Sequence, residues 1–525
     1  MKGNKFVLKI KSNIFDVLAI ILLSCILIVR LYNISSSLYP FSDPARDYLV
    51  AHHIVKFGEK IQLGPLDGIL GNISTPIYFY FLALFLTIKD SILTLQVVNT
   101  ILHIINVGAI YILTKKLFSA GTAIIASLFI VFSYTLSQLT INFFQPNIMT
   151  PFISVVNIIL LQAYIKRSFS LLLISNVILV FAAALHKSAF AFMMPFLLIS
   201  LFIILKRFKK SCAFHSFVLV LVLFVSLVIF YLPTLYFAYQ ADNTSVLSSV
   251  GEIINSPSKF LGSFIENTTS FANFFLFQEE VVTMIPSTNN NILLFIIVVS
   301  GVVYLLSKNI DLKRKTYIVI LLFTIFTFIS LLSFIRISIL RTWYFSPIWS
   351  LFIIFISEIV SSVFTKNLLS RITLGILISI LLYIFSQNIS PFYYGRKNTS
   401  WLDSLAKNIF NEVNDIRKKE NRNDVHFFVV KGYLQNHFEV PYQLWNILEK
   451  QYDDRFIKVD SSTADSSRFK DLNTDDFIFL ICDVEREKGS VNEKCIHEFL
   501  KTHINYTLTK EIASGSNYQT YLFRK

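Results

Sequence analysis

Two aspartates and an arginine lie close together in the stretch YPFSDPARDYLV, which follows the first long apolar run of the chain. In a helix that begins near Asp43, the side chains of Asp43 and Asp47 are four residues apart and share one face, with Arg46 beside them. One interpretation is local, because a cap at Ser42 or Asp43 begins a helix and the charge of Asp47 favours its dipole. The other is chemical, because a carboxylate at a sheltered membrane edge can accept a proton from a hydroxyl nucleophile.

Further polar side chains stand in short segments between apolar runs, in NFFQPN, ALHKSAF and RISILRTWYFSP. Each one alone is also explained as an ordinary loop residue, or as a base whose side chain reaches the membrane surface. Together, cations that converge near a carboxylate would meet the charge of a phosphate on a lipid leaving group. The residues concerned are Gln145, Asn147, His186, Lys187, Arg336, Arg341 and Tyr344.

The sequence carries no recognised metal or nucleotide signature. Its nine histidines form no HExxH and its four cysteines no CxxC, and there is no Walker or GxGxxG loop. Nucleotide hydrolysis is therefore unsupported, and no metal site and no definite cofactor are predicted. Dependence on a divalent cation is left open.

Apolar runs dominate the chain of 525 residues, which is 54% hydrophobic and 15% charged. Runs of about 20 residues are long enough to cross a bilayer, so the sequence predicts a polytopic, all-α membrane module over residues 1–390. A run of about 12 residues, 77–88, is shorter than a span. The predicted spans are 14–32, 92–114, 120–139, 147–165, 169–185, 188–205, 214–237, 292–307, 316–335, 344–364 and 372–387.

The net charge of +14 lies wholly in this module, because residues 391–525 hold 20 basic and 20 acidic side chains. Basic residues in short loops orient membrane spans, so no nucleic-acid partner is expected. If 77–88 is an interfacial helix, with Tyr78 and Tyr80 at headgroup level, 18 basic residues of the module lie inside and nine outside. That arrangement obeys the positive-inside rule, and it predicts a multi-pass plasma (inner) membrane protein with a cytoplasmic N-terminus. Loops 33–91 and 240–289 and the tail are then extracytoplasmic.

The tail, residues 391–525, has shorter apolar runs and more charge, which indicates a small extracytoplasmic α/β domain. Helices are predicted at 401–419, 442–450 and 495–502, and strands at 425–430, 456–459, 476–481 and 518–523.

The motifs of the membrane module resemble, in their order, those of bacterial GT-C glycosyltransferases, above all protein O-mannosyltransferase-like and aminoarabinose-transferase-like enzymes. The order is an aspartate-bearing first loop, GNISTPIYFYFLALFL, KKLFSAGTAIIASLFIVFS, QPNIMTPF, ALHKSAFAFMMPFLL and RTWYFSPIW. The resemblance implies 11–13 transmembrane helices with juxtamembrane helices in the first external loop. It also implies transfer of a hexose or pentose, with inversion, from a polyprenyl-phosphate donor to a hydroxyl of a glycan, lipid or protein on the extracytoplasmic face.

The same resemblance suggests roles for individual residues. Asp43 matches the general base of the family, and Lys187 and Arg341 match basic residues that hold the donor phosphate. Many relatives have Asp-Glu where this chain has Asp43 and Pro44, so Asp47 becomes the candidate for the second acid. Further candidates for binding the donor phosphate or substrate are Arg46, His186, Gln145, Asn147 and Tyr344.

Two other classes of function compete with this hypothesis. A lipid-linked sugar flippase or secondary transporter would place charged residues near the bilayer midplane, whereas the predicted spans hold few acids, Glu358 among them. A membrane anchor for an external binding domain would not need about eleven spans.

The topology can be tested by labelling. In a background without native cysteines, Lys116→Cys should resist an impermeant thiol reagent added from outside, because the charge bias places Lys116 in the cytoplasm. Thr244→Cys, in a predicted outward loop, should react and serves as the control. Ready labelling at position 116 would show that 77–88 spans the membrane.

The tail contains Cys482 and Cys495, and disulfides persist on the extracytoplasmic side. We therefore predict a bridge between these two cysteines. Protein purified without reductant should show neither thiol free in a mass-spectrometric alkylation assay; two free thiols would contradict the bridge.

Overall fold

The structure is a computed structural model of the whole chain. It describes residues 16–21, 23–24, 42–61, 64, 75–132, 143, 145–186, 188–240, 302, 304–306, 310–335, 345–364, 400–421, 427–431, 457–460, 477–483, 496, 500, 507–514 and 518–524.

The chain divides into two compact units. The membrane unit comprises Met1–Ser36 and Ile54–Tyr394, and the tail unit comprises Ser37–His53 and Gly395–Lys525. Helix α2 (Ser42–Phe57) runs through the point where the chain passes from one unit to the other. The first part of the loop predicted to be external therefore groups with the tail rather than with the spans, a division that hydropathy alone does not reveal.

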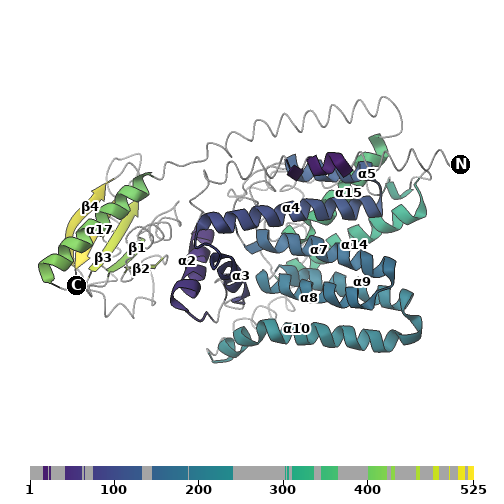
Figure 1. Ribbon diagram of the computed structural model, residues 1–525, viewed down its shortest axis with the longest axis horizontal. Helices are drawn as coiled ribbons and strands as arrows, with labels where there is room; N and C mark the ends of the chain where they lie inside the picture. The colour runs from purple at the N-terminus through teal and green to yellow at the C-terminus, as the bar shows by residue number, and fades with distance from the viewer. Residues whose placement is uncertain are drawn as a thin grey trace. The chain divides into compact units, whose positions relative to one another are not determined.

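The membrane unit is a bundle of long apolar helices that lie side by side (Figure 1). Five described helices are long and apolar enough to cross a membrane, and α5, α8 and α15 are shorter apolar helices. The prediction of a polytopic membrane protein is confirmed, while residues 372–387 and most of 14–32 and 292–307 lie outside the described part. The helices are α3 (Ile77–Leu86), α4 (Ile92–Leu117), α5 (Ala120–Phe132), α7 (Gln145–Lys166), α8 (Phe169–Leu185), α9 (Ala189–Arg207), η2 (Lys209–Ser211), α10 (Cys212–Gln240), α14 (Leu312–Ile335) and α15 (Ser346–Phe364).

One end of the bundle gathers the basic residues, and we call it the basic end. The C-termini of α4, α7 and α9 carry lysine or arginine in their last turns, where cations favour the helix dipole. Ring contacts join these ends to the starts of neighbouring helices, Phe169 of α8 to Phe208 after α9 and Phe118 after α4 to Tyr317 of α14. The basic residues therefore lie together in space, as expected if this end faces the cytoplasm.

Helix α3 lies at the opposite end of the bundle and differs in direction from α7 and α8 (Figure 1). Its ten residues rise about 15 Å, half of the hydrocarbon thickness, so it is too short to span. The Tyr78 hydroxyl donates to the Phe143 carbonyl at 2.6 Å, and the Thr75 hydroxyl before α3 donates to the Ala184 carbonyl near the end of α8 at 2.8 Å. These bonds attach α3 to the helices beneath it.

The two tyrosines of α3 both have partners within the protein. Tyr78 is fully buried, so its ring does not face the lipid, and its depth in the membrane stays a prediction. Tyr80 is partly exposed, but its hydroxyl donates to the Ile61 carbonyl and accepts from the Ile61 amide. A phenol hydroxyl that has protein partners of this kind serves to fix the loop after α2.

The tail unit contains a five-stranded sheet and one long helix, α17 (Ser400–Glu420). The strands are β1 (Phe427–Lys431), β2 (Ile457–Asp460), β3 (Phe477–Asp483), β4 (Thr507–Ser514) and β5 (Tyr518–Arg524). Their order is β2-β1-β3-β5-β4, with β1 parallel to β2 and β3, and β5 antiparallel to β3 and β4. The predicted α/β class, the helix at 401–419 and four strands are confirmed; the helices predicted at 442–450 and 495–502 fall almost wholly outside the described residues.

Helix α17 buries one apolar stripe and pairs its charged face with the sheet. Glu412 binds Lys510 of β4 at 2.6 Å and Glu420 binds Arg524 of β5 at 2.8 Å. The sequence analysis missed β4 because residues 507–511 are exposed and mostly polar, so the strand lacks the apolar pattern of its neighbours. The buried stripe consists of Leu405, Ala406, Ile409, Val413 and Ile416.

Candidate functional site

Helix α2 begins at Ser42, so Asp43 is its second residue. The predicted helix start is thereby confirmed, with Pro44 in the first turn, where the missing amide proton costs nothing. The side chain of Asp43 lies outside the described residues. Its position in the helix nevertheless determines the backbone spacing between Asp43 and Asp47, which is about one helical turn.

Asp47 forms a buried ion pair with the residue before it. Its side chain is fully buried, and its Oδ1 accepts hydrogen bonds from Nε of Arg46 at 2.9 Å and from Nη2 at 2.7 Å. Tyr48 and His52 of the same helix stack at 5.8 Å between ring centroids and are buried as well. The carboxylate charge of Asp47 is thus met by Arg46, and the pair fixes the guanidinium against the helix.

His186 occupies the turn between α8 and α9, where it caps the end of α8. It is buried, and its Nδ1 lies 2.7 Å from the Ser188 hydroxyl and accepts the Ser188 amide at 3.4 Å. Accepting this bond at Nδ1 leaves the ring proton on Nε2. The Ser188 hydroxyl also lies 3.9 Å from Sδ of Met149 in α7. This turn is therefore packed against the start of α7.

Gln145 and Asn147 both lie in the first turn of α7 and are buried. They are at the same end of the bundle as α3, because Tyr78 binds the carbonyl of Phe143 just before this helix. The structure therefore brings together three of the predicted positions, Gln145, Asn147 and His186, from segments about 40 residues apart.

The other predicted site residues lie outside the described part of the chain. Lys187 falls between His186 and Ser188, whose backbone positions bracket it, and Arg341 and Tyr344 come just before Phe345 and α15. Cys495 is also outside it, and Cys482 is described only as a residue of β3. The roles of these residues and the disulfide stay predictions.

Buried polar residues inside the spans were missed by the sequence analysis. In α4 the buried set is Gln96, Asn99, Thr100, His103 and Asn106, and in α7 it is Asn147, Thr150 and Ser154. Spacings of three and four residues place each set along one side of its helix, which is the signal that could have revealed them. The two helices pack on each other, and each polar stripe begins near the end where α3 lies. Polar residues in a membrane interior are expensive and commonly serve function.

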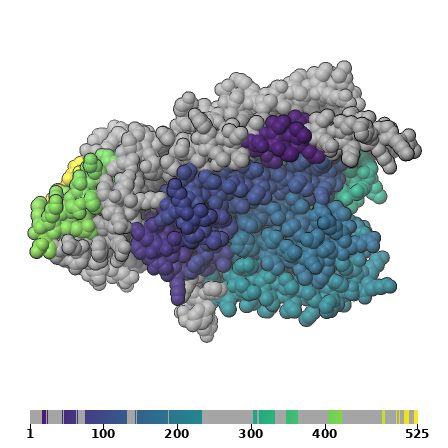
Figure 2. All heavy atoms as spheres, in the orientation of Figure 1, coloured from purple at the N-terminus to yellow at the C-terminus, as the bar shows by residue number. Residues whose placement is uncertain are grey.

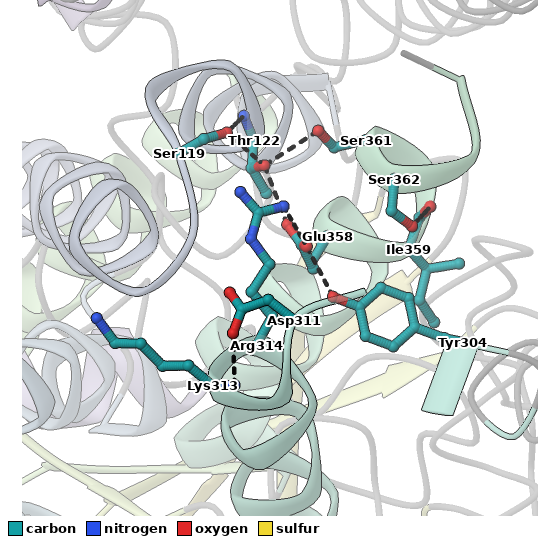
Figure 3. A network of polar contacts seen from close by, with 10 residues as sticks. All are labelled: Ser119, Thr122, Tyr304, Asp311, Lys313, Arg314, Glu358, Ile359, Ser361 and Ser362. Carbon is teal, nitrogen blue, oxygen red and sulfur yellow. Dashed lines mark hydrogen bonds and ion pairs between the residues drawn. The ribbon is translucent and has the colours of Figure 1, made fainter. Parts of the chain in front are cut away.

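Glu358, which the sequence analysis noted within the predicted spans, lies in a network at the basic end (Figure 3). Its buried carboxylate accepts from the Tyr304 hydroxyl at 2.7 Å, from Nη1 of Arg314 at 3.2 Å and from the Thr122 hydroxyl at 3.1 Å. Thr122 lies in turn 3.0 Å from Ser361 Oγ. The network joins α5, α14 and α15, so a structural role accounts for this acid, which offers little support for a transport path.

Among the described residues, no group of three or more His, Cys, Asp or Glu side chains could hold a metal ion. The side chains of Asp43, Lys187 and Arg341 are not among them, so metal dependence stays untested.

Comparison with known proteins places this geometry in context. Residues 74–235 match a family described as dolichyl-phosphate-mannose-protein mannosyltransferase. The match runs from the start of α3 into α10 and includes Gln145, Asn147, His186 and Lys187, but not Asp43. A comparison with curated protein sequences gave no significant match.

Among solved structures, the chain aligns with ArnT from Cupriavidus metallidurans bound to undecaprenyl phosphate, at 10% identity and a TM-score of 0.55. The alignment covers 96% of this chain and 97% of that one. The chain has the GT-C fold. The apo structure of the same ArnT gives equal values. The fold that the sequence motifs predicted is confirmed, and the alignment extends over nearly the whole length of both chains.

The buried pair in α2 generates a prediction about stability. Asp47→Asn should lower the free energy of unfolding by about 1–3 kcal/mol, because Arg46 loses a charged acceptor in a largely buried setting. Arg46→Gln should cost a similar amount. The double variant should cost less than the sum of the two, since the partner left without its counter-charge is then absent. Thermal unfolding of the purified protein in one detergent measures all four proteins.

Proposed function

We propose that this GT-C protein is a glycosyltransferase that moves a hexose or pentose from a polyprenyl-phosphate donor to a hydroxyl acceptor on the extracytoplasmic face. The observation that carries the proposal is the full-length alignment with ArnT, whose solved structure is bound to undecaprenyl phosphate. The family match over residues 74–235, described as a mannosyltransferase, supports the same class of reaction.

In the proposed reaction the acceptor hydroxyl attacks the anomeric carbon of the donor sugar. The new bond joins the acceptor oxygen to this carbon while the bond from the carbon to the phosphate oxygen breaks. The acceptor proton passes to the carboxylate of Asp43, and polyprenyl phosphate leaves. A single displacement of this kind inverts the anomeric configuration. Proton transfer to a positioned base raises the nucleophilicity of the acceptor oxygen in the transition state.

Negative charge grows on the phosphate as the sugar departs, so cations close to it stabilise the transition state more than the ground state. Lys187 and Arg341 are our candidates for this contact. Lys187 is next to His186, whose buried imidazole is held by Ser188 against α7. A rigid turn of this kind limits the conformations of the lysine that follows the histidine. Arg341 precedes α15 by a few residues, in the segment whose motif led to the family resemblance.

The two aspartates of α2 take different roles in this proposal. The carboxylate of Asp47 is committed to Arg46 and buried in the folded protein, so it holds the guanidinium in place. Asp43 then remains the candidate for the base. In this proposal Asp47 does not act as a second catalytic acid. It orients the cation of Arg46 near the start of α2.

The extracytoplasmic location rests on the charge bias of the helix ends. Lysines and arginines gather at the basic end, and α3, His186 and the start of α7 lie at the other end. The acceptor belongs to the class of hydroxyl-bearing glycans, lipids or proteins. The proposed reaction needs neither a nucleotide nor an organic cofactor. A divalent cation would serve only as an optional aid to phosphate binding.

Replacement of the proposed base tests the function. Asp43→Asn should lower the rate of sugar transfer from a radiolabelled polyprenyl-phosphate donor by about 10²–10⁴-fold, because general base catalysis supplies an acceleration of that size. Asparagine still caps and starts a helix, so folding and membrane insertion should be unchanged. Transfer is measured in vesicles that contain equal amounts of each protein.

Asp311→Asn is a matched control, because Asp311 is also an aspartate at a helix start and its Oδ1 accepts the Lys313 amide at 2.7 Å. This variant lies at the basic end and should keep full transfer activity. Near-wild-type transfer by Asp43→Asn would reject Asp43 as the base. Absence of transfer by the wild type with every polyprenyl donor tried would reject the glycosyltransferase and favour movement of lipid-linked sugars.

A further inference from the structure

Six basic residues crowd the ends of two neighbouring helices at the basic end. Two of them end or directly follow α7, two end α9, and two belong to the short helix η2. Most are exposed. Helices α7 and α9 contact each other here through Tyr164 and Arg207. We call these residues the α7–α9 basic cluster: Lys166, Arg167, Lys206, Arg207, Lys209 and Lys210.

Two ordinary roles explain part of this charge. Cations in the last turn of a helix favour its dipole, and basic loops orient spans. Neither role explains how the Arg207 side chain is placed. Its guanidinium lies 4.0 Å from the centre of the Tyr164 ring on the neighbouring helix. Its Nε is buried and has no hydrogen-bond acceptor among the described residues. The residue as a whole is partly exposed, so the other N–H groups of this stacked guanidinium can donate to an oxygen from outside the chain.

The helices α4 to α10 contain no acidic residue that could act as a counter-charge for this cluster. No aspartate or glutamate occurs between Asp90 and Asp242, a stretch that contains all of α4 to α10. Elsewhere at the basic end, Lys115 binds Asp16 and Arg314 binds Glu358. Within the described part of the chain, no such ion pair involves a member of the α7–α9 basic cluster. An anion that binds here therefore does not compete with a carboxylate of the described residues.

Apolar side chains lie beside the cations on the surface that spans the bilayer. Phe202 and Leu205 of α9 and Ile165 of α7 are exposed. The Nζ of Lys206 lies 5.4 Å from the Phe202 ring and 6.0 Å from the Tyr164 ring, so the lysine stem covers aromatic surface while its charge stays at the helix end. Figure 2 shows the atoms of the long helices, in blue and teal, as a broad and continuous face. A ligand that matches this surface carries an anionic head and apolar chains.

We propose that the α7–α9 basic cluster binds the headgroup of an anionic phospholipid, with the terminal N–H groups of the Arg207 guanidinium donating to a phosphate oxygen. The neighbouring lysines supply further positive charge, and the acyl chains lie along Phe202 and Leu205. An anionic leaflet surface attracts basic segments next to spans with about 1 kcal/mol for each residue, so the site lies where its ligand is concentrated. The proposal does not depend on the glycosyltransferase activity, because the cluster is at the end of the bundle away from His186.

The test titrates purified full-length protein in a neutral detergent with short-chain phosphatidylglycerol and follows the melting temperature. Phosphatidylglycerol should raise it in a saturable manner, and phosphatidylcholine or inorganic phosphate at equal concentrations should have little effect. Arg207→Gln should weaken the apparent affinity for phosphatidylglycerol about tenfold, the size expected for one charged hydrogen bond. Lys313→Gln removes an exposed lysine at the same end, next to Tyr317, and should leave the affinity unchanged.

Arg207→Lys gives a second measurement if the glutamine variant does not fold. It keeps the positive charge but lacks the planar guanidinium with its several donors, so it should also weaken binding severalfold. Equal losses in Arg207→Gln and Lys313→Gln would overturn the proposal in favour of unspecific charge attraction. Equal stabilisation by phosphatidylcholine, or by inorganic phosphate alone, would overturn it as well.

Discussion

Polar groups inside a bilayer must find their partners within the protein, and the arrangement of this molecule follows from that constraint. Hydroxyl groups in the bundle repeatedly donate to backbone carbonyls near helix ends, as Thr75 does to Ala184 and Tyr231 to Ala183. The buried carboxylate of Glu358 is met by Arg314 and Tyr304. Paired charges stabilise the interior, whereas the remaining cations lie at one end of the bundle. The uneven distribution of charge therefore separates a structural end from the end at which we place chemistry.

Most of the fold could be predicted from the sequence because hydropathy and charge report directly on the membrane. The long helices and the short α3 were predicted in this way. The strands β1, β2, β3 and β5 were predicted from short apolar runs in the tail. Strand β4 was not predicted, because it is exposed and mostly polar. It forms by pairing with β5, and the residues of β4 alone do not indicate that pairing. The position of Tyr78 was predicted from the charge bias and residue type, which do not indicate that its hydroxyl donates to the carbonyl of Phe143, 65 residues away.

The candidate site was less accessible to sequence reasoning. The spacing of Asp43 and Asp47 indicates a shared helix face, but it does not indicate that Asp47 is buried and held by the adjacent Arg46. The polar stripe of α4, from Gln96 to Asn106, was overlooked because the helix is apolar on average and reads as an ordinary span. Sequence motifs could indicate which segments meet, since the turn at His186 and the start of α7 do come together. They could not indicate which side chains there already have hydrogen-bond partners.

The attachment of α3 has a mechanical consequence. Thr75 binds the carbonyl of Ala184 two residues before His186, and Tyr78 binds the carbonyl of Phe143 just before α7. A force applied to α3 from the membrane surface is therefore transmitted to both the histidine turn and the first turn of α7. The two hydrogen bonds couple these three segments, so a displacement of α3 by a change in bilayer thickness would be passed on to the other two.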